Sequence, residues 1–208
     1  MKCRSLVIIV FVLTPKFCLG QQALFNKRLS FVIDSLKKEE PVRSAFDMAP
    51  TERAARKVAK KNFPLIKKIL EKYGFPGYDM VGQKSSDNYC LLVMHSEFAL
   101  DFQKKALDLL AIQVKNSNAN SRSLASLSDI ININDGREQL YGTQLEVKDG
   151  AYRPKHLADP KNVDERRKTV GLGSLAGYLH DLNAFYNTYK NGPWLNGQIS
   201  IKKDTLNH

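Results

Sequence analysis

Apolar residues recur at helical spacing along most of this 208-residue sequence, and this periodicity constrains the fold more than any other feature. Phe25, Leu29, Val32 and Leu36 repeat at intervals of three or four residues until Pro41 ends the pattern. They predict an amphipathic helix of about four turns. A similar stripe near the end of the chain comprises Leu172, Leu175, Ala176, Leu179, Leu182, Tyr186 and Tyr189.

The middle of the chain predicts further helices. A polar, basic stretch over residues 51–61 precedes Asn62, which can cap a new helical turn. Pro64 is tolerated in the first turn of a helix, so we expect a helix that starts there and ends at Gly74. From Ser85 or Ser86 onward the sequence is apolar on every side of a helix, which predicts the most central helix.

The hydrophobic period changes after residue 136. Helical spacing over residues 98–114 and 124–131 ends at the turn sequence 134–136, and residues 139–147 are then rich in strand formers. A turn at 148–150 can lead the chain back into a short second strand. The sequence therefore predicts a mainly α fold, a single helical domain over residues 21–190 with one small β-hairpin. Residues 191–208 form a polar C-terminal tail.

The N-terminus has the three regions of a secretory signal peptide. A short basic start is followed by the apolar run Leu6 to Leu13, which is far shorter than the ~20 residues that span a bilayer, and by small residues at 18 and 20. Cleavage after Gly20 predicts an exported protein, periplasmic or secreted, with no transmembrane helix. Lipidation of Cys18 is the alternative, which the bulky and charged residues at 15–17 disfavour.

Charge and cysteine content narrow the function classes. The chain has 32 Lys and Arg against 21 Asp and Glu, and removal of residues 1–20 lowers its net charge of +11 by three. Cys90 is then the only cysteine, and its apolar neighbours favour a buried structural thiol over a nucleophile. The remaining basicity suggests anionic surroundings, but no recognition motif for nucleic acid is present, and we expect no nucleic-acid partner.

Two groups of polar residues are candidates for a site. Gln139, Tyr141 and Thr143 share one face of the expected strand, with Gln144 beside them, and an ordinary exposed strand face is an equally good interpretation. Arg167 could supply an anion clamp to that face, although such residues are more often on a solvated helix surface.

His95 is the candidate catalytic residue. It ends the most apolar helix, so that a titratable ring lies where the chain leaves the core, and a hydrogen-bonded structural histidine is the competing interpretation. The four histidines have no metal-ligand spacing, so we expect no metal site and no cofactor. The glycine-rich stretch 171–177 lacks a preceding strand, which favours helix entry over nucleotide binding.

Several blocks of the sequence resemble a bacterial domain family of unknown function. Its members share "GWP…VG", "QHSD-like" and "QLYGTQ" blocks in this order, and the resemblance covers roughly residues 50–180. The matching blocks here are 73–77 with 81–82, 94–96, 136–144 and 163–167 with 171–172. Met94 stands where that family usually has Gln, and Ile130 follows Asp129 where it often has Arg. The resemblance implies no activity.

Two hypotheses for the function follow. In the first, a polar pocket formed by His95, the residues 139–144 named above and Arg167 binds or hydrolyses an anionic small molecule or envelope polymer. His95 would act as general acid or base and Arg167 as the anion anchor. In the second, the protein is not an enzyme and holds an anionic partner on a basic surface. The lysines of that surface are Lys57, Lys60, Lys61, Lys67, Lys68 and Lys72.

Overall fold

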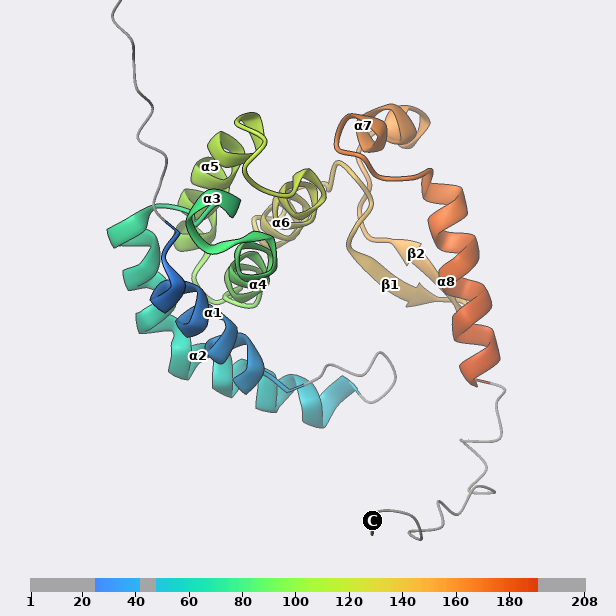
Figure 1. Cartoon of the computed structure of the whole chain (residues 1–208). Coiled ribbons are helices and arrows are strands. Elements are labelled where there is room, and N and C mark those ends of the chain that lie inside the picture. Colours follow the sequence, from blue (N-terminus) through green and yellow to red (C-terminus); the bar gives the residue numbers. More distant parts are fainter. Residues whose placement is uncertain (1–24, 42–47, 191–208) are drawn as a thin grey trace, which may run out of the picture.

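The computed structural model describes residues 25–41 and 48–190, and its architecture is mainly α with one small hairpin, as the sequence predicts (Figure 1). The predicted signal peptide at 1–20 and the polar tail at 191–208 lie outside the described residues. The elements are α1 (Lys27–Glu39), α2 (Met48–Tyr73), α3 (Tyr78–Val81), α4 (Gln83–Met94), α5 (Leu100–Lys115), α6 (Ser121–Asn134), β1 (Leu145–Lys148), β2 (Ala151–Pro154), the 3-10 helix η1 (Pro160–Asn162), α7 (Val163–Thr169) and α8 (Leu175–Lys190).

Helix α4 is the centre of the helical part. It contacts α1, α2, α3, α5 and α6, and its Tyr89, Leu92 and Val93 are completely buried. The prediction of a central helix ending near His95 is therefore confirmed. Cys90 is also buried on this helix, and burial raises the pKa of its thiol to about 12. A thiol that stays protonated in this way is structural, as its apolar neighbours indicate.

Helix α2 differs from the prediction, because it is continuous through Pro64. The sequence suggested a new helix near Asn62, with Pro64 in its first turn. Instead, Pro64 lies well inside a 26-residue helix, where it can donate no hydrogen bond to the carbonyl one turn earlier. The apolar contacts of Ile66, Ile69 and Leu70 with the core hold the helix together across this position.

Replacement of Pro64 by alanine is expected to stabilise the protein by up to ~3 kcal/mol, because Pro64 is exposed and alanine restores the helical hydrogen bond. Urea unfolding of the two proteins measures the change. Lys57→Ala, at another exposed position of α2, is the control and should leave the free energy of unfolding nearly unchanged. A destabilised Pro64→Ala protein would contradict the expectation.

The hairpin is shorter than predicted. Strands β1 and β2 pair antiparallel, with Leu145 opposite Pro154 and Lys148 opposite Ala151. Residues 139–144 are not part of β1, so the prediction that Gln139, Tyr141 and Thr143 share a strand face is wrong. Gln139 makes a single isolated bridge to Leu157, and the residues after it form a loop. The reason lies in α6, whose Asp129 binds the backbone of that loop.

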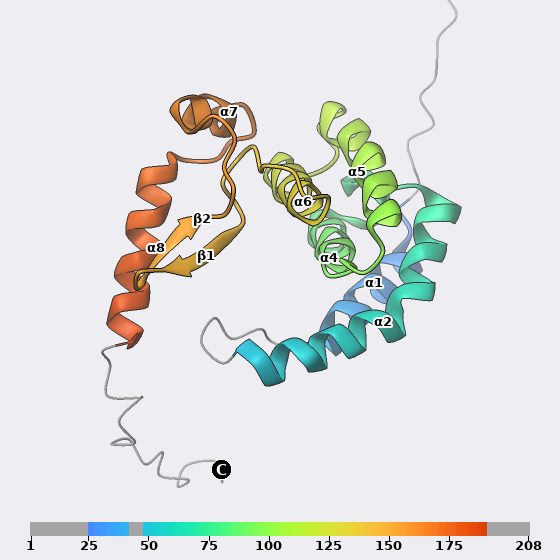
Figure 2. The ribbon, with the colours of Figure 1, turned by 180° about the vertical axis from the view of Figure 1, so that it is seen from behind.

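The hairpin, α7 and α8 lie together on one side of the molecule, and α1 to α6 lie on the other (Figure 2). Helix α8 packs on β2, where Tyr152 meets Tyr186 edge to face at 5.1 Å and Asn183 accepts a hydrogen bond from the Tyr152 amide. The loop that follows α6 joins the two parts. No helix within the described ranges is long and apolar enough to cross a membrane.

Candidate functional site

The loop after α6 is wound around one buried carboxylate. Asp129 is completely buried, and its two oxygens accept five hydrogen bonds of 2.7–3.2 Å. The donors are the amides of Leu140, Tyr141 and Thr143 and the hydroxyl of Thr143. An ionised carboxylate in such a nest satisfies donors that would otherwise be buried without a partner. Asp129 thereby fixes the loop to α6.

Gln139 closes the same loop from its other side. Its side chain is fully buried, donates to the carbonyls of Gln144 and Lys155, and accepts from the Gln144 amide. The Gln144 side chain in turn donates to the Thr143 hydroxyl. These hydrogen bonds connect the loop to the segment that follows β2.

Arg167 and Arg166 bind the backbone of this region. Arg167 is buried and donates to the carbonyls of Tyr141 and Gly173, and Arg166 donates to the carbonyl of Leu140. Burial is the main cause that lowers the pKa of the Arg167 guanidinium. An anion would have to displace these carbonyls to reach Arg167.

The loop geometry also explains a glycine. Gly142 has a φ of +68°, and a Cβ atom at this position would come within 3.1 Å of Leu175. The close approach of the α8 side chain and the left-handed backbone both require glycine.

Most polar groups of Gln139, Thr143, Gln144 and Arg167 serve the fold of this segment through the hydrogen bonds described above. Their role as ligand-binding groups stays a prediction.

His95 belongs to a different cluster. Its Nδ1 atom lies 2.7 Å from Oε2 of Glu40, which follows α1, and the same oxygen lies 3.3 Å from Nζ of Lys37. The side chain of Glu40 is only 3% exposed and that of His95 is 18% exposed. Burial alone would raise the pKa of Glu40, but the hydrogen bond from His95 and the charges of His95 and Lys37 outweigh it, so that the pKa lies below its ordinary value.

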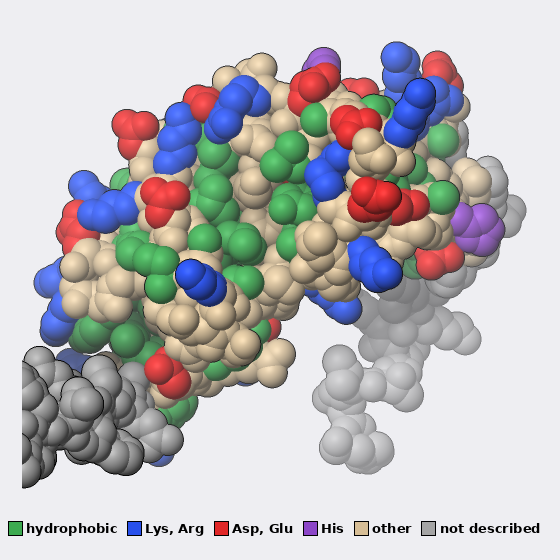
Figure 3. Space-filling view, turned by 90° about the horizontal axis from the view of Figure 1, so that it is seen from above, with side chains coloured by type: hydrophobic (Ala, Val, Ile, Leu, Met, Phe, Trp, Pro, Cys, Tyr) green, Lys and Arg blue, Asp and Glu red, His purple; other side chains and the backbone are tan. Residues whose placement is uncertain are grey.

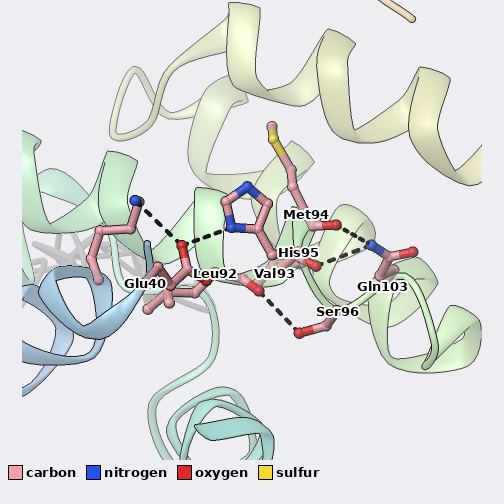
Figure 4. A network of polar contacts seen from close by, with 8 residues as sticks. Glu40, Leu92, Val93, Met94, His95, Ser96 and Gln103 are labelled. Carbon is pink, nitrogen blue, oxygen red and sulfur yellow. Dashed lines mark hydrogen bonds and ion pairs between the residues drawn. The ribbon is translucent and has the colours of Figure 1, made fainter. Parts of the chain in front are cut away.

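The contact with Glu40 determines which ring nitrogen of His95 can accept a proton. An ionised Glu40 can only accept a hydrogen bond, so Nδ1 carries the proton and Nε2 carries the lone pair when the ring is neutral. Figure 4 shows Nδ1 directed toward Glu40 and the second ring nitrogen free of any dashed contact. This is the orientation of a histidine that takes a proton through Nε2.

Buried polar side chains hold the end of α4 that carries His95. The Ser96 hydroxyl donates to the carbonyl of Leu92, and the Gln103 amide donates to the carbonyls of Val93 and Met94, each at 3.0 Å (Figure 4). Ser96 and Gln103 are both completely buried. The last carbonyls of a helix have no partner within the helix, so these bonds fix its end and the histidine on it.

A cavity of about 190 Å³ opens beside His95. It is lined by Glu52, Arg53, Arg56, His95, Glu97 and Phe98. Arg53 and Arg56 are three residues apart on α2 and therefore lie on the same side of that helix. Among the described residues, neither arginine has an ion-pair partner. The lining includes neither Tyr141 nor Arg167, so the structure does not unite the predicted site residues in this cavity.

The Glu40 contact makes stability depend on pH. Because the folded-state pKa of Glu40 is below its ordinary value of 4.5, this carboxylate stabilises the fold above the unfolded-state pKa and loses that effect as the pH falls through the folded-state pKa. We expect Glu40→Gln to lower the free energy of unfolding at neutral pH, with a difference from the parent that shrinks below about pH 4.5. Urea titrations across this range measure it.

Glu146→Gln is the matched control, because Glu146 is exposed on β1. Its difference from the parent protein should stay near zero at every pH. If the free energies of unfolding of Glu40→Gln and the parent differ by the same amount at every acid pH, the Glu40 carboxylate does not cause the pH dependence of stability.

Three residues of these clusters, Glu40, Arg53 and Arg56, have no recognisable signal in the sequence, and a fourth, Asp129, has a weak one. Glu40 is separated from His95 by 55 residues, and Arg53 and Arg56 lie in a stretch of basic residues that looks like an ordinary solvated face. Asp129 had a weak signal, since a carboxylate interrupts the apolar stripe of Leu127 and Ile131. No group of three or more His, Cys, Asp or Glu side chains in the described part of the chain could hold a metal ion.

Comparison with known proteins gives a family and no activity. Residues 32–190 match DUF6624, a family of unknown function. Neither the curated proteins nor the solved structures include a match to this chain. The resemblance to a family of unknown function is thereby confirmed at that level, and the bacterial source and the individual sequence blocks remain predictions.

Proposed function

We propose that this chain, which belongs to the DUF6624 family of unknown function, binds a small anionic group and hydrolyses the ester that carries it. One observation carries the proposal: the hydrogen-bonded pair of His95 and Glu40 borders a cavity that Arg53 and Arg56 also line. A proton acceptor and two cations around one small space are the parts that hydrolysis of an anionic ester requires.

The chemistry assigns one task to each group. The neutral His95 ring accepts a proton at Nε2 from a water molecule as the water oxygen bonds to the phosphorus or carbonyl carbon of the ester. The bond to the leaving oxygen then breaks, and the imidazolium returns the proton to that oxygen. Glu40 holds the ring in the required tautomer and stabilises its positive charge, which makes it a positioning residue.

The arginines supply the anion site. A guanidinium can donate two parallel hydrogen bonds to a phosphate or carboxylate, and two guanidinium groups on one helix face can hold its oxygens together. Glu52 and Glu97 also line the cavity and limit its total positive charge. A volume of about 190 Å³ fits an anionic group and its immediate attachment, which suits the end of a larger molecule better than an extended polymer.

Binding of inorganic phosphate to the full chain tests the anion site. We expect Arg53→Gln and Arg56→Gln each to weaken phosphate binding about tenfold, because each removes one charge-assisted contact. Arg122→Gln removes an exposed arginine on α6 and should leave the affinity unchanged. Calorimetric titration gives the dissociation constants. Equal affinities in all four proteins would contradict the assignment of the two arginines.

Export remains part of the proposal. The basic start, apolar run and small residues at 18 and 20 support removal of residues 1–20, and an exported hydrolase would meet anionic esters of the envelope or of the surroundings.

A further inference from the structure

A groove of about 390 Å³ separates the outward sides of α1 and α2. The two helices lie side by side in both views of the ribbon (Figures 1 and 2). Lys61 of α2 forms an ion pair of 3.0 Å with Glu39 of α1. The groove is lined by Asn26, Arg28, Leu29, Val32, Leu65, Lys68, Ile69, Lys72 and Tyr73. It shares no lining residue with the His95 cavity.

The groove combines an apolar floor with a cationic rim. Leu29 and Ile69 are buried at its base, and Arg28, Lys68 and Lys72 are all exposed at its edges. None of the residues that line it is acidic. The long stems of lysine and arginine can cover apolar surface and still extend their charges outward.

The helix surfaces beside the groove extend this pattern. Phe31 is 72% exposed and Leu65 is 41% exposed, and both are large apolar side chains in contact with solvent. Lys27 and Lys38 lie on the same side of α1 as Phe31, because they are four and seven residues away from it. Three carboxylates lie near these residues, and each pairs with a lysine: Asp34 with Lys84, Glu39 with Lys61 and Glu71 with Lys67. We call the groove with Lys27, Phe31, Lys38 and Lys61 the α1–α2 face.

The face of the molecule that is seen from above has a different character. The molecule seen from above carries Lys and Arg interspersed with Asp and Glu around the rim, with hydrophobic side chains between them (Figure 3). Mixed charge of this kind gives little net attraction for an anionic surface. The α1–α2 face instead presents six cations and two exposed apolar side chains, and the carboxylates beside it are each paired with a lysine.

We propose that the α1–α2 face docks the protein on the surface of an anionic lipid bilayer. Each lysine or arginine near such a surface is attracted to its anionic headgroups, and exposed Phe31 and Leu65 can enter the boundary between headgroups and acyl chains. The cations explain attraction to any polyanion. The exposed apolar residues between them favour a bilayer, because a soluble polyanion offers no apolar phase to receive them.

Sedimentation of the full chain with vesicles tests the proposal. Vesicles of phosphatidylcholine with phosphatidylglycerol are compared with vesicles of phosphatidylcholine alone. The triple variant Arg28→Gln, Lys68→Gln and Lys72→Gln is expected to bind the anionic vesicles on the order of 100-fold more weakly than the parent. Phe31→Ala should weaken binding about tenfold with all charges retained.

Matched variants separate this face from general charge and from the N-terminal apolar run. Lys115→Gln, Lys148→Gln and Lys161→Gln remove the same charge elsewhere, and Ile112→Ala truncates an exposed apolar residue on α5, so both should bind like the parent. Equal binding of all variants, also to neutral vesicles, would overturn the proposal and assign binding to residues 6–13. A loss in the triple variant with no effect of Phe31→Ala would likewise overturn it in favour of a soluble polyanion.

Discussion

Asp129→Ala is expected to lower the free energy of unfolding by about 3–5 kcal/mol, because it removes a buried, hydrogen-bonded carboxylate. The carboxylate is completely buried and accepts hydrogen bonds from the amides of Leu140, Tyr141 and Thr143. Alanine would leave these donors without an acceptor in the interior. Because the loop joins α6 to the hairpin, losing these hydrogen bonds also weakens the attachment of the hairpin, α7 and α8 to helices α1 to α6.

Urea unfolding measures this change, and hydrogen exchange of the three amides locates it. Asp108→Ala removes an exposed carboxylate on α5 and should change the free energy of unfolding by less than ~0.5 kcal/mol. Thr143→Val removes only the hydroxyl that donates to Asp129 and should cost about 1–2 kcal/mol. An Asp129→Ala protein as stable as Asp108→Ala would refute the structural role of the carboxylate.

The helices could be predicted from the sequence because their signal is local. The apolar stripe of α1 and the uninterrupted apolar stretch of α4 each fit one helix, and the observed elements are close to the expected ones. The continuous α2 could not be predicted, because the penalty for Pro64 is a local quantity and the core contacts of Ile66 and Ile69 that offset it are tertiary. The local preference of proline favours a helix start at this position, and the packing of α2 against the core keeps the helix continuous instead.

The polar residues show the same division between local and tertiary information. Alternation of residue types around Tyr141 and Thr143 resembles a strand, yet a carboxylate on α6 binds their amides and draws them into a loop. Nothing in the sequence of residues 139–144 specifies this partner. The link between His95 and Glu40 is equally invisible, since a spacing of 55 residues has no periodic signature. His95 itself could be identified because a titratable residue at the end of an apolar helix is unusual.

The separation of the two clusters allows the proposed chemistry to be tested independently of folding. Asp129 and its loop carry stability, and the His95 cavity shares no lining residue with them. A substitution at His95 should therefore change turnover more than the free energy of unfolding. This difference separates a catalytic histidine from one that only satisfies Glu40.

His95→Gln is expected to reduce kcat for hydrolysis of para-nitrophenyl phosphate by a factor on the order of 10²–10⁴, the range typical for loss of a general base. Glutamine can still donate to Glu40 but cannot take a proton from water. Glu40→Gln should reduce kcat less, by about 10–100-fold, because it removes the orientation and charge stabilisation of the ring and leaves the ring in place. The release of para-nitrophenolate measures both rates.

His180→Gln is the matched control, because His180 also lies beside a carboxylate, Asp181, but is exposed on α8. It should retain the kcat of the parent. The dependence of kcat/KM on pH that the imidazole contributes should disappear in His95→Gln and persist in His180→Gln. If His95→Gln keeps the rate and the pH profile of the parent, or if its loss of rate only follows a loss of folded protein, His95 is a structural partner of Glu40 and the proposed hydrolysis fails.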